Sequence, residues 1–246
     1  MGAKVTLYTR NILETGTVTV TGTPDTGYSE ERLYDRCIDL YWLDTVTGAV
    51  DFTVDQGAGA ALPVDSLFID GHNFDGEDLQ WQYSTDNFSG DINDMVTDWT
   101  QSGSDLITKS ASAQTRRYWR VTLSSMTNPQ ATEIFMSYGY EFGVQARPNP
   151  NLREIPNVVW SRTVGNNERS TKFGDARRVR QYGLYLDSTD LTSWRAAMDD
   201  LDGYSNTFYI KDHEDAYIFG RLDGAPAEDH GNADYTTISF TFLEVL

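Results

Sequence analysis

The sequence predicts an all-β fold with one short helix, and three observations lead to that prediction. Short stretches rich in Thr, Val, Tyr, Phe and Ile recur roughly every eight to twelve residues. Clusters of Gly, Asn, Asp and Ser separate these stretches, and helical periodicity is scarce. The length of 246 residues fits one large domain or two small ones, and we expect two antiparallel sandwiches.

In the first part of the chain the strand pattern is clearest over residues 118–123. Alternate residues from Trp119 to Leu123 would face one side of a strand, and Arg120 and Thr122 would face the other. The strands predicted in this part are 17–21, 37–42, 66–70, 79–84, 118–123 and 134–138. Together they predict a half-buried antiparallel sheet structure.

A proline-rich segment follows, since Pro148, Pro150 and Pro156 lie close together. Proline fixes φ and restricts the residue before it, so this segment is expected to be extended and to stay out of a sheet interior. The predicted organisation is a first domain with an N-terminal arm at 1–144, a connector at 145–157 and a second domain at 158–246.

The second domain is predicted to combine strands with a helix near 191–202. Its strands are expected at 158–163, 181–187, 207–211, 216–222 and 236–245. Four apolar residues fall on one stripe of the helix, namely Leu191, Trp194, Met198 and Leu201. Asp190 is the expected N-cap, and Gly203 stands where a left-handed residue ends a helix.

Composition excludes several classes of protein. Asp and Glu outnumber Lys and Arg by 37 to 19, so the net charge of −18 disfavours a grip on nucleic-acid phosphates. Polar residues interrupt every apolar run, which disfavours a membrane span. The single cysteine, Cys37, excludes an internal disulfide and is expected to be a small buried residue. The N-terminus lacks a signal-peptide pattern, so we expect folding in a reducing cytosol.

Few residues offer catalytic chemistry. His72, His213 and His230 lack a second His or Cys at zinc-ligand spacing, and no nucleophile elbow or phosphate-binding loop is present. We expect His72 to make a structural loop contact and the other two histidines to be solvated. The prediction is no enzyme, no catalytic residue and no cofactor, although a glycosidase pair among so many carboxylates stays open.

A calcium ion among the acidic loops is a second open alternative. Residues 91–94 begin like a calcium loop, but Met95 and Val96 stand where an oxygen ligand and a glycine are required. No metal ligand is therefore predicted, and solvated surface charge is the preferred interpretation.

Aromatic residues could form a sugar-stacking platform. The candidates are Trp42, Tyr83, Trp81, Trp99, Trp119 and Trp160. Most of them occupy predicted strand positions, so packing in the core is the preferred interpretation.

Charge is unevenly distributed along the chain. Residues 141–186 hold 8 Lys and Arg against 4 Asp and Glu, a net charge of +4, whereas the flanking stretches carry −12 and −10. Scattered solvated charge is one interpretation, and an arm that docks on an acidic face of a neighbouring copy is the other. The predicted subunit-interface residues are Arg147, Arg153, Arg169, Arg177, Arg178 and Arg180. Charge reversal at the last three is expected to weaken assembly more than folding.

The runs 63–74, 79–86 and 117–123, with Trp99, resemble discoidin-like (galactose-binding-like) jelly rolls, in the version found in tail proteins of tailed bacteriophages. The likeness covers about residues 12 to 142. The second half is similar to the sandwich domains of phage tail-tube, distal-tail and minor-tail proteins, through its helix, its hairpin and its terminal strand.

The resemblance implies a structural virion component made in the host cytoplasm. Such proteins polymerise as rings, often hexameric, and contact other tail or baseplate proteins; the resemblance implies no catalytic residue. The primary hypothesis is therefore a structural subunit that forms part of the tail or baseplate by ring-type self-assembly. The alternative is a carbohydrate-binding module that recognises host-surface glycan through the jelly-roll loops.

Overall fold

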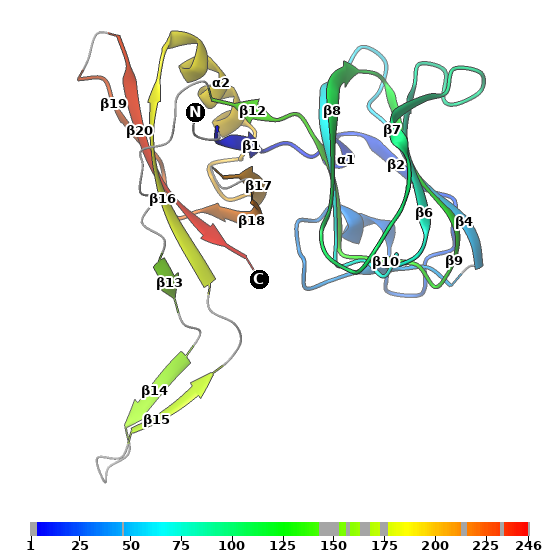
Figure 1. Ribbon diagram of the computed structural model, residues 1–246, viewed down its shortest axis with the longest axis horizontal. Helices are drawn as coiled ribbons and strands as arrows, with labels where there is room; N and C mark the ends of the chain where they lie inside the picture. The colour runs from blue at the N-terminus through cyan, green and yellow to red at the C-terminus, as the bar shows by residue number, and fades with distance from the viewer. Residues whose placement is uncertain are drawn as a thin grey trace. The chain divides into compact units, whose positions relative to one another are not determined.

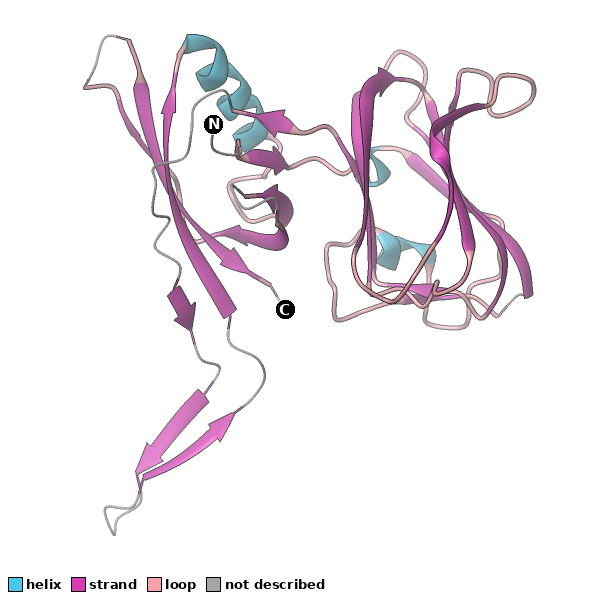
Figure 2. Cartoon of the chain, viewed as in Figure 1, coloured by secondary structure: helices cyan, strands magenta, loops and turns pink. Residues whose placement is uncertain are grey.

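The computed structural model describes residues 4–45, 47–142, 153–155, 158–162, 168–172, 177–212, 216–231 and 234–245 (Figure 1). Strands dominate this part of the chain, and the α-helices in it are short (Figure 2). The all-β prediction with a short helix is confirmed. Contacts divide the chain into two compact units, residues 10–139 and residues 1–9 with 140–246, called here the sandwich unit and the terminal unit.

The sandwich unit contains a five-stranded and a three-stranded antiparallel sheet. The first has the order β2 (Thr17–Val20), β4 (Thr47–Asp55), β9 (Tyr118–Thr127), β6 (Asp78–Ser84) and β7 (Asn93–Thr100). The second has the order β11 (Glu133–Ser137), β5 (Pro63–Asp70) and β8 (Ile107–Thr115). The short pieces are α1 (Ile12–Thr15), the 3-10 turn η1 (Glu30–Leu33), and the pair β3 (Trp42–Leu43) with β10 (Gln130–Ala131).

The inner faces of these two sheets share one apolar core. On β9 the side chains of Trp119, Val121 and Leu123 are fully buried, whereas Arg120 and Thr122 are only partly buried. The predicted alternation is thus confirmed. The core includes Trp42, Phe52, Phe74, Leu79, Trp81, Ile107 and Ile134.

The strand predicted at 37–42 is wrong, because only Trp42 belongs to a strand. Arg36 has a positive φ of 59° and its N–H donates to the buried carboxylate of Glu133 at 3.0 Å. The Asp35 carboxylate accepts the N–H of Cys37 at 2.9 Å. These two bonds, the first long-range and the second local, bend the chain away from an extended path, and Cys37 is half-buried.

The terminal unit is built on one large antiparallel sheet. Its order is β12 (Tyr140–Glu141), β1 (Thr6–Tyr8), β17 (Phe208–Lys211), β18 (Tyr217–Leu222), β20 (Thr236–Glu244), β16 (Arg177–Leu186) and β13 (Arg153–Ile155), and β19 (Ala227–Asp229) also pairs with β20. β14 (Val158–Arg162) and β15 (Glu168–Lys172) form a separate two-stranded ribbon.

The sandwich unit is an insertion in this sheet. β1 and β12 pair antiparallel, with Leu7 opposite Tyr140, so the chain leaves and re-enters the sheet on neighbouring strands. Asn11 holds the start of the sandwich unit against β11, because its Nδ2 donates to the carbonyl oxygen of Ile134 and its Oδ1 accepts the N–H of Met136. The N-terminal arm that the sequence analysis grouped with the first domain pairs with the terminal unit instead. Most of the predicted connector at 145–157 lies outside the described residues, and 153–155 form β13.

The helix α2 (Ser188–Asp199) supplies part of the terminal unit's core. Trp194, Met198 and Leu201 are buried as predicted, and the Trp194 ring lies 5.2 Å from that of Phe240. The N-cap is Asp187 and not Asp190: the Asp187 carboxylate accepts the N–H groups of two first-turn residues. The helix therefore begins earlier than the apolar stripe. Gly203 has the expected positive φ, 70°.

Candidate functional site

The predicted aromatic platform is reduced to two residues by burial. Trp42, Trp81 and Trp119 are fully buried and belong to the core, which confirms the preferred interpretation for them. Trp99 and Tyr83 are partly exposed. The side chain of Trp160 lies outside the described residues.

Trp99 borders a polar cavity on the five-stranded sheet. The cavity has a volume of about 360 Å³, and its lining residues come from β6, β7 and β9: Asp78, Gln80, Asp98, Trp99, Thr100 and Ser124. We call this set the polar face. Asp78 and Gln80 alternate along β6 with Leu79, whose side chain is buried in the core. The alternation therefore places both polar side chains on the outer surface of the sheet.

Hydrogen bonds hold the polar face in a defined arrangement. Gln80 Nε2 donates to Asp98 Oδ2 at 2.7 Å, across the β6–β7 pair. Thr100 Oγ1 donates to Asp78 Oδ1 on the same two strands. These bonds use one donor of the Gln80 amide and leave several carboxylate lone pairs for another donor.

A second set of side-chain hydrogen bonds lies farther along the same sheet and involves larger side chains. Arg120 Nη2 donates to Gln82 Oε1 at 2.6 Å, and Gln82 Nε2 donates to Asp94 Oδ1 at 2.9 Å. The Arg120 guanidinium lies 4.2 Å from the centre of the Phe88 ring. The bonded chain gives this surface fixed hydrogen-bonding groups next to an aromatic ring.

The Trp99 ring lies on the opposite side of β7 from the polar side chains that line the cavity, and it contacts the facing sheet. Lys109 Nζ on β8 lies 4.4 Å from the ring centre, a cation–π contact. Burial lowers the pKa of Lys109. Trp99 lies between Asp98 and Thr100 on β7 and opposite Leu79, so its ring points to the core side of the sheet, away from the polar side chains.

The predicted strand 79–84 already placed Gln80 and Gln82 on one face, so alternation could have found part of this site. Asp98 and Thr100 could not be found, because β7 was not predicted. Only Met95 in this strand is buried, so β7 lacks the alternation that indicates a half-buried strand.

The histidines take the structural and solvated roles predicted where they are described. His72 is buried: its Nε2 contacts the carbonyl oxygen of Asp105 at 2.8 Å, and its Nδ1 accepts the Phe74 N–H at 3.2 Å. Burial lowers the pKa of His72. His230 is exposed, and His213 lies outside the described residues.

The acidic loop 84–91 bonds to itself. Asp86 Oδ1 accepts the N–H groups of Ser89 and Asp91, and Asp91 Oδ2 accepts both polar groups of Thr85. The Ser84 hydroxyl also donates to Asp86 at 2.9 Å; this bond, followed by the backbone bonds, lowers the pKa of Asp86, and the Thr85 bonds lower the pKa of Asp91. Within the described residues, no three His, Cys, Asp or Glu side chains gather in a way that could hold a metal ion.

No helix in the described part of the chain is long and apolar enough to cross a membrane.

The predicted interface arginines are not brought together as one set. Arg153 and Arg177 are exposed on β13 and β16, and Arg178 is exposed beside Glu244, with 3.6 Å between Nε and the carboxylate. Arg180 is different, since it is 6% exposed and forms an ion pair with Asp212, which is 0% exposed.

The exposure assumed for Arg180 is therefore wrong. Its position on β16 points it into the packed side of the sheet, where removal of one partner leaves an uncompensated charge. The charge-reversal test is accordingly limited to Arg177 and Arg178. Arg147 lies outside the described residues, and only the backbone of Arg169 is described, on β15.

No family model matches the chain, and no curated protein matches it. Solved structures similar to about half of the chain include a chitosan-binding module from a Paenibacillus chitosanase/glucanase, with a TM-score of 0.44 and 18% identity, covering 52% of this chain and 99% of that one. A Clostridium perfringens module solved with GalNAc-β-1,3-galactose has a TM-score of 0.42 and 12% identity, covering 51% and 96%.

A Ruminococcus gnavus GH29 fucosidase, solved with fucose, has a TM-score of 0.45 and 17% identity. The match covers 53% of this chain and 27% of the fucosidase. The expected place in a phage tail stays a prediction.

Proposed function

We propose that the sandwich unit binds carbohydrate through the polar face. The observation that carries this proposal is the cavity lined by a fixed set of carboxylate, amide and hydroxyl groups from β6 and β7. Sugar hydroxyls both donate and accept hydrogen bonds, and this set offers both functions on a surface whose side chains are already ordered. Several of the similar solved structures are described as carbohydrate-binding, and the proposal for this chain rests on its own residues.

The test is binding of the full chain to a broad array of bacterial surface glycans, followed by titration of each ligand found. Gln80→Ala and Asp98→Ala are expected to weaken binding about tenfold, the effect of losing roughly one to two hydrogen bonds. Gln114→Ala on β8 is the matched control, since it removes a half-exposed glutamine from the other sheet. Equal affinity of all three variants, or no ligand on the array, would contradict the proposal.

A second function is favoured by the ribbon of β14 and β15. We propose that the terminal unit assembles with copies of itself into a ring, as a subunit of a phage tail or baseplate. Within the described residues these two strands pair only with each other. An isolated two-stranded ribbon is marginally stable in water and exposes unpaired strand edges, so packing against another chain would stabilise it.

The expected result for the purified full chain is a ring, with six copies favoured, in electron microscopy and native mass spectrometry. A partner from the tail or baseplate would bind such a ring and not an isolated copy. A chain that remains monomeric at every concentration tested, and that is absent from virions, would contradict this second function.

A further inference from the structure

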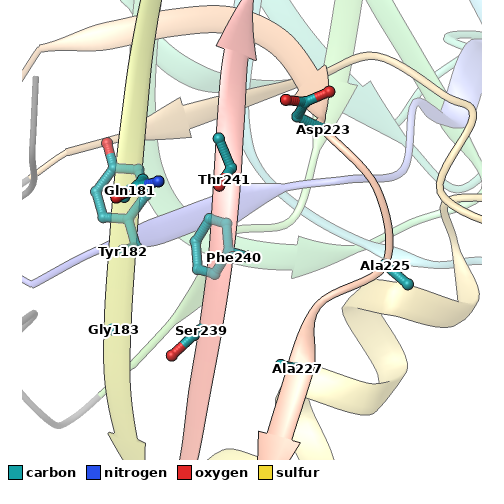
Figure 3. Close-up of a pocket in the computed structure, with 9 residues that line it drawn as sticks. All are labelled: Gln181, Tyr182, Gly183, Asp223, Ala225, Ala227, Ser239, Phe240 and Thr241. Atoms are coloured by element: carbon teal, nitrogen blue, oxygen red, sulfur yellow. The ribbon is translucent and has the colours of Figure 1, made fainter. Parts of the chain in front are cut away.

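The outer side of the β16–β20 pair carries a groove that neither proposed function has used. One cavity of about 370 Å³ is lined by residues of β16, β20 and the segment from Asp223 to Ala227 (Figure 3). A second, of about 340 Å³, continues it toward Arg153, Ile155 and Val179. The two cavities share Gln181, Asp223 and Thr241, so they form one channel, which we call the β16–β20 groove.

Small residues make the floor of this groove. Gly183 lies opposite Ser239, and Gln181 lies opposite Thr241, in adjacent rows of the same sheet face. The intervening residues Tyr182, Leu184 and Ile238 belong to the core, so the groove lies on the side of the sheet that faces away from that core. A floor of Gly and Ser allows a second backbone to approach closely.

The edge of the groove is partly apolar. Ile155 is 41% exposed, and Ala225 and Ala227 are also exposed (Figure 3). The N–H of Asp223 donates to the carbonyl oxygen of Thr241 at 2.9 Å, which holds the Asp223 segment against β20. The result is a sheet face with an ordered border and no covering element among the described residues.

We propose that the β14–β15 ribbon of a second copy occupies the β16–β20 groove. This inference rests on the proposed self-assembly and identifies the surface that performs it. β14 and β15 (residues 158–162 and 168–172) carry three basic residues and one acidic residue, a net charge of +2, whereas the terminal unit as a whole, residues 1–9 with 140–246, carries −5; the groove lining includes Asp223 and Arg153. A cationic strand pair and an acidic receiving unit attract one another over about a Debye length, roughly 8 Å at physiological salt.

The topology of the sheet favours a second copy over the chain's own ribbon. Ile155 pairs with Arg177, the first residue of β16, so the chain leaves the sheet at that end after β13. The groove extends in the opposite direction, from Val179 toward Gly183.

The test uses two single-cysteine versions of the full chain in a Cys37→Ser background. One carries Ser170→Cys on the ribbon and the other carries Ser239→Cys on the groove floor. The two are mixed and treated with a short bis-maleimide, so that a covalent heterodimer reports contact between copies only. We expect this heterodimer to form at least tenfold faster than one made with Ser112→Cys, an exposed position on β8.

A blocking variant supplies the second measurement. Ser239→Trp places a large ring in the groove, and because Ser239 is exposed the fold is expected to survive. The concentration for half-assembly is expected to rise at least tenfold, whereas Ser112→Trp leaves it unchanged. Light scattering measures assembly, and circular dichroism checks folding.

The outcomes separate the two proposals. Rings that form without the ribbon-to-groove crosslink, and that tolerate Ser239→Trp, would overturn the groove proposal and leave self-assembly standing. A wild-type chain that never assembles would overturn both. Crosslinking together with loss of assembly in Ser239→Trp supports both.

Discussion

Among single residues, His72 shows how a loop contact sets a protonation state. Its Nδ1 accepts the N–H of Phe74, so the neutral ring carries its proton on Nε2 and donates to the carbonyl oxygen of Asp105. A second proton, on Nδ1, would turn this acceptor into a donor that faces the N–H donor of Phe74. Burial accordingly lowers the pKa of this imidazole.

A lowered pKa in the folded state means that the unfolded chain binds the proton more readily. Stability from His72 is therefore present above the unfolded pKa of about 6.5 and is lost as the pH falls toward the folded value. His72→Gln keeps an acceptor and a donor without titrating. Thermal denaturation between pH 7.5 and 5 is expected to show a steeper loss of stability in the wild type; parallel curves would contradict this assignment.

Arg180 differs from its neighbours in sequence because it is buried with Asp212. Arg180→Glu would bury two like charges, and we expect a loss of about 3–5 kcal/mol or more in unfolding free energy. The exposed Arg177→Glu is expected to change stability by about 0.5 kcal/mol or less. Urea denaturation of both variants tests this difference, and equal midpoints would show that Arg180 is solvated after all.

At the scale of elements, α2 shows what the sequence pattern could and could not locate. The stripe of Trp194, Met198 and Leu201 identified the helix and its buried side. The start was misplaced because Ser188 and Thr189, which open the helix, contribute no apolar residue to that stripe. The cap depends on which carboxylate reaches the first free N–H groups, and Asp187 does so.

Removal of this N-cap is expected to lower the stability of the terminal unit measurably. Asp187→Ala is expected to lower the unfolding free energy of the terminal unit by about 1 kcal/mol, the usual effect of losing an N-cap. Asp190→Ala removes a first-turn charge and is expected to cost less, about 0.3–1 kcal/mol. Denaturant titration followed by helical circular dichroism compares them, and a larger effect at Asp190 would restore the sequence-based assignment.

Strand prediction succeeded where burial alternates and failed where it does not. Trp119, Val121 and Leu123 alternate with polar residues because β9 lies in the middle of its sheet. The edge strand β7 has one buried residue, Met95, and carries half of the polar face, so Asp98 and Thr100 were not found. The 37–42 segment looked like a strand because five of its six residues are apolar, while long-range bonding of Arg36 to Glu133 decided its path.

For the whole molecule, the decisive feature is the insertion of residues 10–139 between paired strands β1 and β12. No local sequence pattern predicts such an insertion, because strand propensity does not indicate which other strand a given strand pairs with. The sequence analysis therefore assigned the N-terminal residues to the unit that follows them in the chain, although they pair with the other one.

The insertion predicts that the units fold separately. Replacement of residues 10–139 by a short Gly-rich turn joins β1 to β12 as an ordinary hairpin. The shortened chain is expected to keep cooperative thermal unfolding and self-assembly and to lose glycan binding. Circular dichroism, light scattering and the glycan array measure these properties, and an unfolded product would show that the terminal unit depends on its insert.

A domain attached through two adjacent strands can be exchanged without altering the register of the sheet that carries it. Under the two proposed functions, exchange at these two points is expected to change the glycan that is bound and to leave self-assembly unchanged. Ligand preference and assembly would then depend on separate segments of one chain.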